Sequence, residues 1–286
     1  MKLPSVFTSW LQVGPTALIL AFFFIVPMFV VIIVSFFDYD NGSIVETFIT
    51  QNYIDVFTSN VTVLQYFSSL KFAFIVWALT LVIGFNVAYF LVFHVRNLLI
   101  QIGLFLLCTV PFWTSNIIRM ISWLPVLGKT GVINRTLEAM GIINTPLEFL
   151  LYSDFAVVVG YVHLFTLFMV VPIFNSMARI DRSLLEAARD AGAGRFRVVW
   201  EIVLPLSKTG IALGSIFVVT QVMGDFFVIK VMSGGQSTSV VSALYNQVSA
   251  MQYPPAAASA VLLLIVVTLM VAGILHVVDV RKQLAA

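Results

Sequence analysis

The chain has 286 residues, of which 60% are hydrophobic and 10% are charged, and its mean hydropathy is +1.05. In soluble proteins about a quarter of the residues are charged. This composition therefore excludes an ordinary soluble protein and indicates several membrane crossings. The net charge of +2 is too small and too scattered to favour a nucleic-acid partner. The single cysteine, Cys108, cannot form an internal disulfide.

Six stretches of the sequence are long and apolar enough to form transmembrane helices. A helix needs about 20 apolar residues to cross a hydrocarbon core of about 30 Å. The sequence has no segments of about ten residues in which apolar and polar residues alternate, so a transmembrane β-barrel is not favoured. We therefore predict an all-α, polytopic membrane protein with six spans, at residues 14–37, 68–93, 98–126, 154–176, 209–230 and 255–278. The charge-free run at residues 3–37 is too long for the core of a signal peptide, so we expect a retained first span.

The distribution of lysine and arginine predicts the orientation of these spans, because cytoplasmic loops carry the excess of both residues. With the N-terminus inside, the outer loops hold only Lys129 and Arg135. The inner segments hold ten such residues: Lys2, Arg96, Arg179, Arg182, Arg189, Arg195, Arg197, Lys208, Arg281 and Lys282. The expected organisation is a cytoplasmic N-terminus at 1–13, one membrane domain at 14–278 with a cytoplasmic loop at 177–208, and a cytoplasmic C-terminus at 279–286.

The loop at residues 177–208 is a polar island between apolar runs, and its sequence predicts a short helix. Ser183 and Glu186 have the spacing of a capping box, in which each side chain bonds the other residue's backbone amide. The helix should therefore start at Leu184. It should stop near Gly192, because glycine takes the left-handed conformation after a helix without a side-chain penalty.

A second amphipathic helix should follow Gly194, with Phe196, Val199, Trp200 and Val203 as its apolar face, and Pro205 should end or bend it. Two such helices could lie on lipid headgroups or dock on another protein. Small residues permit close approach of a protein but bury little area in a bilayer, and the loop is rich in them: Ala187, Ala188, Ala191, Gly192, Ala193 and Gly194. Docking on a protein is therefore the favoured interpretation.

The same loop contains a long spaced motif. It reads Glu186-Ala187-Ala188, three residues, Gly192, nine residues, Ile202, one residue and Leu204-Pro205. The motif resembles the EAA signature in the membrane subunit of bacterial ATP-driven importers that take substrate from a binding protein. The resemblance implies a type I ABC importer permease bundle of the MetI-like kind, with the loop inserted into a cleft of a separate ATPase. The residues that it assigns to ATPase coupling are Ser183, Leu185, Glu186, Ala187, Ala188, Asp190, Ala191, Gly192, Ile202, Leu204 and Pro205.

Polar residues within the spans are candidates for a substrate pathway, since ionisable residues at membrane depth usually face the interior of a helix bundle. If each span is a straight helix, Arg119 lies about 30 Å along the third span and Asp225 about 25 Å along the fifth. Arg119 either lines the pathway or extends its long side chain to an aromatic belt at the membrane interface. The short side chain of Asp225 cannot reach the interface in this way. Asp225 is therefore the stronger candidate. The candidates together are Trp113, Asn116, Arg119, His163, Gln221 and Asp225. His163, Gln221 and also Asn86 are weaker candidates, since buried polar residues also join helices by hydrogen bonds.

Further segments resemble putrescine/spermidine-type permeases, namely residues 111–115, 118–119, 123, 127–128, 131–134, 185–193, 224–226 and 233–235. This resemblance implies import of a polyamine or a similar small cationic solute. Relatives that import iron, an opine or another small solute leave the substrate open. A cation would suit Asp225 and the acidic outer loops, whereas Arg119 would oppose it.

The resemblance also implies the partners of the chain in the bacterial inner membrane. They are a second permease, homologous or identical, two ATPase subunits that hold ATP and Mg, and a periplasmic or lipid-anchored binding protein. The chain itself would be no enzyme and bind no cofactor or metal. Gly128-Lys129-Thr130 is no phosphate loop, because Trp123 stands where the required glycine belongs. The rival interpretation is an ion-coupled secondary carrier with Asp225 as its cation site, and the missing inverted repeat disfavours it.

Overall fold

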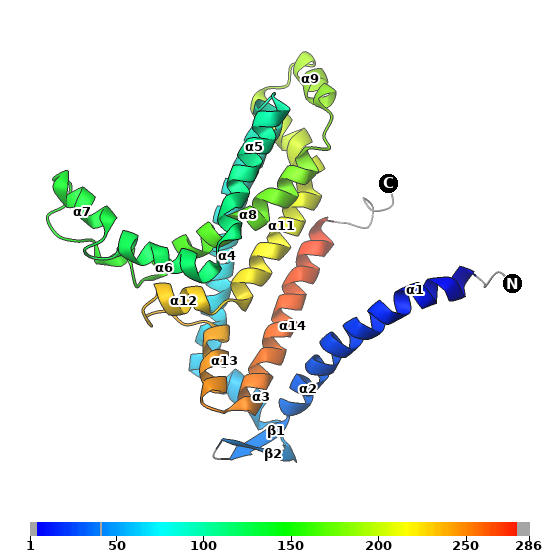
Figure 1. Cartoon of the computed structure of the whole chain (residues 1–286), viewed down its shortest axis with the longest axis vertical. Coiled ribbons are helices and arrows are strands. Elements are labelled where there is room, and N and C mark those ends of the chain that lie inside the picture. The colour runs from blue at the N-terminus through cyan, green and yellow to red at the C-terminus, as the bar shows by residue number, and fades with distance from the viewer. Residues whose placement is uncertain (1–4, 41, 279–286) are drawn as a thin grey trace. The chain divides into compact units, whose positions relative to one another are not determined.

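The computed structural model describes residues 5–40 and 42–278, and its contacts divide the chain into two compact units (Figure 1). Unit 1 comprises Met1–Val63 and Ala243–Ile265. Unit 2 comprises Leu64–Ser242 and Val266–Ala286. The C-terminal segment predicted at 279–286 lies outside the described residues, as do residues 1–4 of the predicted N-terminal segment.

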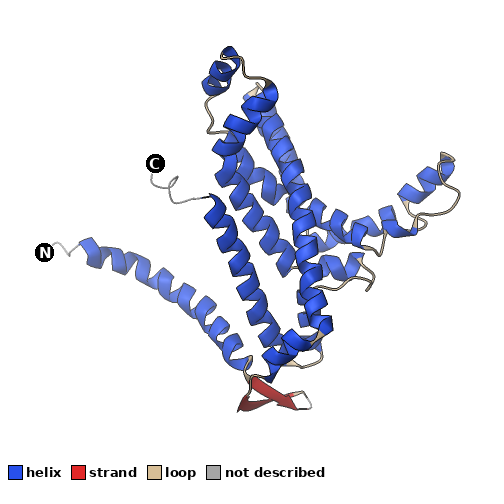
Figure 2. Cartoon of the chain, turned by 180° about the vertical axis from the view of Figure 1, so that it is seen from behind, coloured by secondary structure: helices blue, strands red, loops and turns tan. Residues whose placement is uncertain are grey.

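Unit 1 combines long helices with a small hairpin (Figure 2). Its elements are α1 (Ser5–Leu20), the π turn η1 (Ala21–Ile25), α2 (Val26–Val34), β1 (Phe37–Asp40), β2 (Ser43–Phe48), α3 (Gln51–Thr58), most of α13 (Val240–Ser249) and the first part of α14 (Tyr253–Val278). The strands are antiparallel, with Tyr39 opposite Ile44, and Gly42 supplies the positive φ of +84° in their turn. The buried Asn52 amide of α3 donates to the carbonyls of Ser35 and Phe37 at 3.0 and 2.8 Å, which holds α3 against the junction between α2 and β1.

Unit 2 is a bundle of helices with short irregular turns. Its elements are α4 (Asn60–Tyr89), which begins just before the unit, the π turn η2 (Phe90–His94), α5 (Leu98–Thr109), η3 (Val110–Trp113), α6 (Asn116–Leu127), α7 (Val132–Ala139), η4 (Glu148–Leu150), α8 (Asp154–Met177), α9 (Arg182–Asp190), α10 (Arg195–Val198), the π turn η5 (Val199–Val203), α11 (Leu204–Gly224) and α12 (Phe227–Met232). The hairpin apart, the described chain is helical, so the predicted helical fold class is confirmed.

The core of unit 2 is formed by α8 packed along α11. Two glycines one turn apart on α11 let the backbones approach closely. A Cβ on Gly210 would lie 2.4 Å from the Pro172 carbonyl oxygen, and one on Gly214 would lie 2.7 Å from the Met169 sulfur. Small residues four apart are the usual means by which membrane helices pack, so this pair explains the length of the α8–α11 contact.

Five helices among residues 5–40 and 42–278 are long and apolar enough to cross a membrane: Val13–Val34, Asn60–His94, Glu148–Met177, Arg195–Gly224 and Tyr253–His276. The predicted spans at 154–176 and 255–278 therefore match α8 and α14 within a few residues. The first predicted span ends too late, because the hairpin begins at Phe37.

The third predicted span, at 98–126, is not one straight helix. Leu98–Trp113 and Asn116–Ala139 meet at 91°, so the second part turns sharply away from the first. Thr114 is extended, and the Ser115 hydroxyl accepts from the Ile117 amide at 3.3 Å, which starts a new helix there. The expected 30 Å depth of Arg119 was therefore wrong, since it assumed a continuous axis.

The fifth predicted span, at 209–230, starts too late and ends too late. One continuous helix runs from Arg195 to Gly224, so the expected second short helix of the loop is its first part. Pro205 does not end this helix, because the turn before it widens to π geometry and the Leu204 amide bonds the Val199 carbonyl. At Asp225 the backbone becomes extended, which separates α12 from the span.

Candidate functional site

The predicted coupling helix is present as α9, but its N-terminal cap differs from the capping box expected. The helix begins at Arg182, and the Asp181 carboxylate accepts from the Ser183 amide at 3.0 Å. Asp181 takes the capping position first because it precedes Ser183 and aspartate is an equally strong cap. Hydrogen bonds from the Ser183 amide and hydroxyl hold the pKa of Asp181 below its usual range. The expectation that Ser183 and Glu186 cap each other was therefore wrong.

The predicted C-terminus of this helix is confirmed at Gly192. Its φ is +84°, its amide donates to the Arg189 carbonyl at 2.9 Å, and the Ala193 amide donates to the Ala188 carbonyl at 2.9 Å. These two bonds form a Schellman motif, which satisfies carbonyls that the end of the helix leaves free. The helix is thus a short rigid element with both ends fixed.

Part of the surface of this loop faces outward. Leu185 is buried, whereas Glu186 is exposed and forms no hydrogen bond or ion pair with the described residues. The rings of Phe196 and Trp200, 80% and 63% exposed, stack with centroids 6.2 Å apart. The expected apolar face of the second helix is therefore divided, because Val203 packs inward while these two rings point outward.

The remaining predicted coupling residues lie around this face. Ala187, Asp190 and Ala191 are exposed, Ala188 is half-buried, and Ser183 is exposed at the start of α9. Ile202, Leu204 and Pro205 lie instead at the π turn and the start of α11. The motif thus has two parts, a short helix and the turn that joins it to a span.

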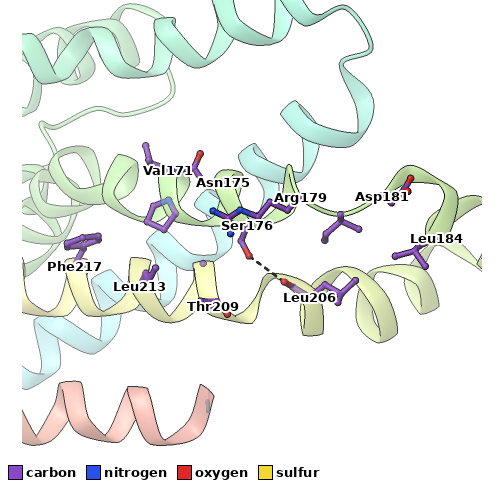
Figure 3. A pocket seen from close by; sticks show the side chains of 13 residues that line it. Val171, Asn175, Ser176, Arg179, Asp181, Leu184, Leu206, Thr209, Leu213 and Phe217 are labelled. Atoms are coloured by element: carbon purple, nitrogen blue, oxygen red, sulfur yellow. Dashed lines mark hydrogen bonds between the residues drawn. The ribbon is translucent and has the colours of Figure 1, made fainter. Parts of the chain in front are cut away.

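A groove runs along the contact between α8 and α11 in unit 2. One part, about 700 Å³, is lined by polar side chains that include Asn175, Ser176 and Thr209, and the Ser176 hydroxyl donates to the Leu206 carbonyl at 3.4 Å (Figure 3). An adjoining apolar part of about 290 Å³ is lined by aromatic residues that include Phe112 and Trp113. Residues shared by both parts make the groove continuous: Val171, Pro172 and Phe217. Sequence reasoning missed these three polar residues, although Asn175 and Ser176 visibly end the apolar run of α8 and Thr209 lies near the start of α11.

The predicted pathway residues fall into two groups, and the first surrounds Arg119. Arg119 is only 8% exposed, lies over the Phe112 ring at 5.3 Å and donates to the Asn116 side chain. Its Nε and Nη1 atoms have no hydrogen-bond partner within the described residues. His163 lies nearby and is exposed, with its ring 5.5 Å from that of Trp123. Arg119 is therefore a buried cation with unused donors.

The second group surrounds Asp225, at the break between α11 and α12. Its carboxylate accepts from the Val228 amide at 2.8 Å and lies beside the buried Tyr161 hydroxyl. Gln221 is exposed one turn earlier on α11. No ion pair joins Asp225 to Arg119 in the described part of the chain. Trp113, at 84% exposed, lies instead in the groove.

A helical membrane bundle with an EAA loop defines the membrane component of a transport system. The chain belongs to the family of binding-protein-dependent transport system inner membrane components, which matches residues 81–283. This membership confirms the prediction of a multi-pass inner-membrane transport subunit that is not an enzyme and carries no cofactor.

Among curated relatives, the chain is similar to the spermidine/putrescine transport system permease protein PotB. The Escherichia coli relative is 35% identical over 224 residues, 76% of this chain and 78% of the relative. The Haemophilus influenzae relative is 33% identical over 218 residues, 76% of this chain and 75% of the relative. Among solved structures, a chain of a bacterial alginate ABC transporter has a TM-score of 0.76 at 15% identity, covering 94% of this chain and 93% of that chain. This last likeness confirms the fold.

Proposed function

We propose that this chain is the permease subunit of an ATP-driven importer and that it couples substrate passage to a separate ATPase through α9. The observation that carries this proposal is the geometry of the EAA loop. Its helix is capped at both ends, yet the outward side chains Glu186 and Ala187 are exposed and Glu186 has no partner in the described chain. Such a face suits docking, because a partner can bias a conformational equilibrium only through contacts that differ between its states.

We propose further that the loop faces the cytoplasm, as do both termini. The excess of lysine and arginine in the segments on that side supports this orientation. The complete transporter would contain a second permease, two ATPase subunits and a periplasmic or lipid-anchored binding protein. The groove along α8 and α11, with polar residues such as Asn175 and Thr209, would be this chain's half of the translocation pathway.

The proposed substrate is a polyamine or a similar small cationic solute. The identity of about a third to the spermidine/putrescine permeases supports this class. The carboxylate of Asp225, beside the Tyr161 hydroxyl at the break between α11 and α12, carries a charge that suits an ammonium. An alternative substrate, such as iron or an opine, would keep the same coupling mechanism.

The test is uptake by proteoliposomes that contain the assembled transporter and the binding protein. Labelled spermidine and putrescine should accumulate only with ATP and the ATPase, and vanadate should stop accumulation. Glu186→Lys and Gly192→Pro should lower uptake roughly 5- to 150-fold, the range of typical coupling energies. Proline cannot adopt the φ of +84° and removes the amide that bonds Arg189.

Gly103→Ala on α5 is the matched control, because it lies outside the EAA loop and a Cβ there would meet nothing within 4 Å. Its uptake should equal that of the unmodified chain at equal amounts of inserted protein. Uptake that persists without the ATPase and follows an ion gradient would instead identify a secondary carrier. Accumulation of ferric ion or an opine in place of polyamines would change the substrate while retaining the importer.

A further inference from the structure

The C-terminal end of α4 is held by side chains from two other helices. The last carbonyls of a helix lack partners within it. Here the π turn η2 leads into an extended Val95, and the Val95 amide bonds the Phe90 carbonyl. The next two carbonyls accept from side chains: Leu91 from the Gln101 amide at 3.0 Å and Val92 from the Arg182 guanidinium at 2.8 Å. Arg182 is 90 residues further along the chain.

Arg182 is also the first residue of α9, directly after the capping Asp181. The same short segment therefore starts the docking helix and bonds the end of α4. Figure 1 shows α9 at the end of unit 2 where α4 turns into α5. The bond joins a cation to the negative end of a helix dipole, which strengthens it relative to a neutral hydrogen bond.

Open space surrounds the base of α9. The polar part of the groove described above, about 700 Å³, lies on the side of α11. A second cavity, also about 700 Å³, is lined by α5 residues such as Ile102 and Phe105. Ile180 and Asp181 line both cavities, and Arg182 lines the second. Dense side-chain packing therefore does not connect the base of α9 to α5, and the Arg182–Val92 bond is a defined link across this space.

We propose that Arg182 is a positioning residue that transmits displacement of α9 to the end of α4 and the turn into α5. The proposal rests on the proposed docking of α9 on an ATPase. When the ATPase moves α9, the guanidinium holds the Val92 carbonyl and takes α4 with it. Without this bond α9 would still dock and the ATPase would still turn over, but less of the motion would reach the spans.

The test compares Arg182→Gln, Arg182→Lys and Arg96→Gln in the reconstituted transporter. Arg96 is the matched control, because it lies in the same α4–α5 turn, is exposed and forms no hydrogen bond or ion pair with the described residues. For Arg182→Gln the uptake per ATP hydrolysed should fall about tenfold while ATPase activity stimulated by the binding protein persists. Arg182→Lys keeps a charged donor and should recover part of this ratio, whereas Arg96→Gln should match the unmodified chain.

A second readout follows the two elements directly. Spin labels at positions 96 and 189, in a chain with Cys108→Ser, report the distance between the α4–α5 turn and α9. In the otherwise unmodified chain this distance should stay constant when an ATP analogue closes the ATPase, and with Arg182→Gln it should change. An unchanged transport ratio in both Arg182 variants, or a distance that stays constant in Arg182→Gln, would overturn the role of Arg182. The proposed function fails separately, if uptake in the unmodified chain is independent of the ATPase.

Discussion

At the scale of single residues, Asp181 determines where α9 begins. Its pKa is held below the usual range by the bonds from Ser183, so the ionised form is favoured by the folded loop. A depressed carboxyl pKa contributes stability above the unfolded pKa, and this contribution is lost as the pH falls through the folded value. We expect the first turn of α9 to loosen only under acidic conditions, below the usual aspartate range.

Hydrogen exchange of the peptide that contains Ser183 measures this effect. In the unmodified chain its protection should be constant near neutral pH and fall on acidification. In Asp181→Ala protection should already be low at neutral pH, and Asp181→Asn, which keeps an acceptor, should retain part of it without the dependence on pH. Equal protection in Asp181→Ala and the unmodified chain would show that the cap does not hold the helix.

The error at this site has a simple origin. Two overlapping capping signals, Asp181 and the pair Ser183 and Glu186, lie within six residues, and local spacing does not choose between them. In the structure Asp181 is the cap, so Glu186 is exposed and has no hydrogen-bond partner among the described residues. Gly192 was predictable, because only a residue that tolerates positive φ fits after the last turn.

At the scale of helices, close packing of α8 on α11 depends on Gly210. A methyl group there would lie 2.4 Å from the Pro172 carbonyl oxygen and 2.6 Å from the Ser176 Cβ, and a backbone carbonyl cannot move aside cheaply. Gly210→Ala should therefore lower the free energy of unfolding by about 1–3 kcal/mol, the usual cost of overpacking. Thermal unfolding in detergent should show a lower midpoint.

The control is Gly103→Ala on α5, where a Cβ would meet nothing within 4 Å. Alanine is a better helix former than glycine, so this midpoint should stay the same or rise. Equal midpoints for the two variants would mean that α8 and α11 can separate without loss of stability.

The helices themselves were predictable to different degrees. Apolar length alone located α8 and α14, because each is one uninterrupted helix. The 91° bend after Trp113 was not predictable from hydropathy, since both sides of the break are apolar and only the Ser115 cap marks it. The hairpin at Phe37–Phe48 was missed because the search for long apolar stretches does not detect short strands. The dipeptide Asn41-Gly42 is nevertheless a strong turn signal in the sequence.

At the scale of the whole transporter, the observed structural role of Asp225 can be separated from its proposed role in transport. Its carboxylate accepts from the Val228 amide, and it is the candidate contact for a cationic substrate. Asp225→Asn keeps an acceptor for the amide but removes the charge. We expect polyamine uptake to fall about tenfold, or ~1.4 kcal/mol of interaction, while ATPase stimulation by the binding protein persists.

Two further variants separate a local contact from the general charge of the segments expected outside the membrane. Asp225→Ala should lower both uptake and thermal stability, because the Val228 amide then loses its acceptor. Glu138→Gln removes an exposed carboxylate of α7 and should leave uptake unchanged. If Asp225→Asn and Glu138→Gln transport equally well, Asp225 serves only to join α11 to α12.

The π turn at Val199–Val203 has a consequence for exchanging parts between relatives. A π turn holds one residue more than an α turn, and one residue corresponds to about 100° of rotation. Replacing residues 195–205 by a fully α-helical segment of the same length would rotate Gly210 and Gly214 by about 100° relative to α9 and away from α8. The angular phase between the docking loop and the span is therefore encoded in residues 195–205. A chimera that exchanges α9 must therefore keep or transfer residues 195–205 as a single block. If the π turn were lost, α9 and α11 would no longer have the rotational relation seen in this structure.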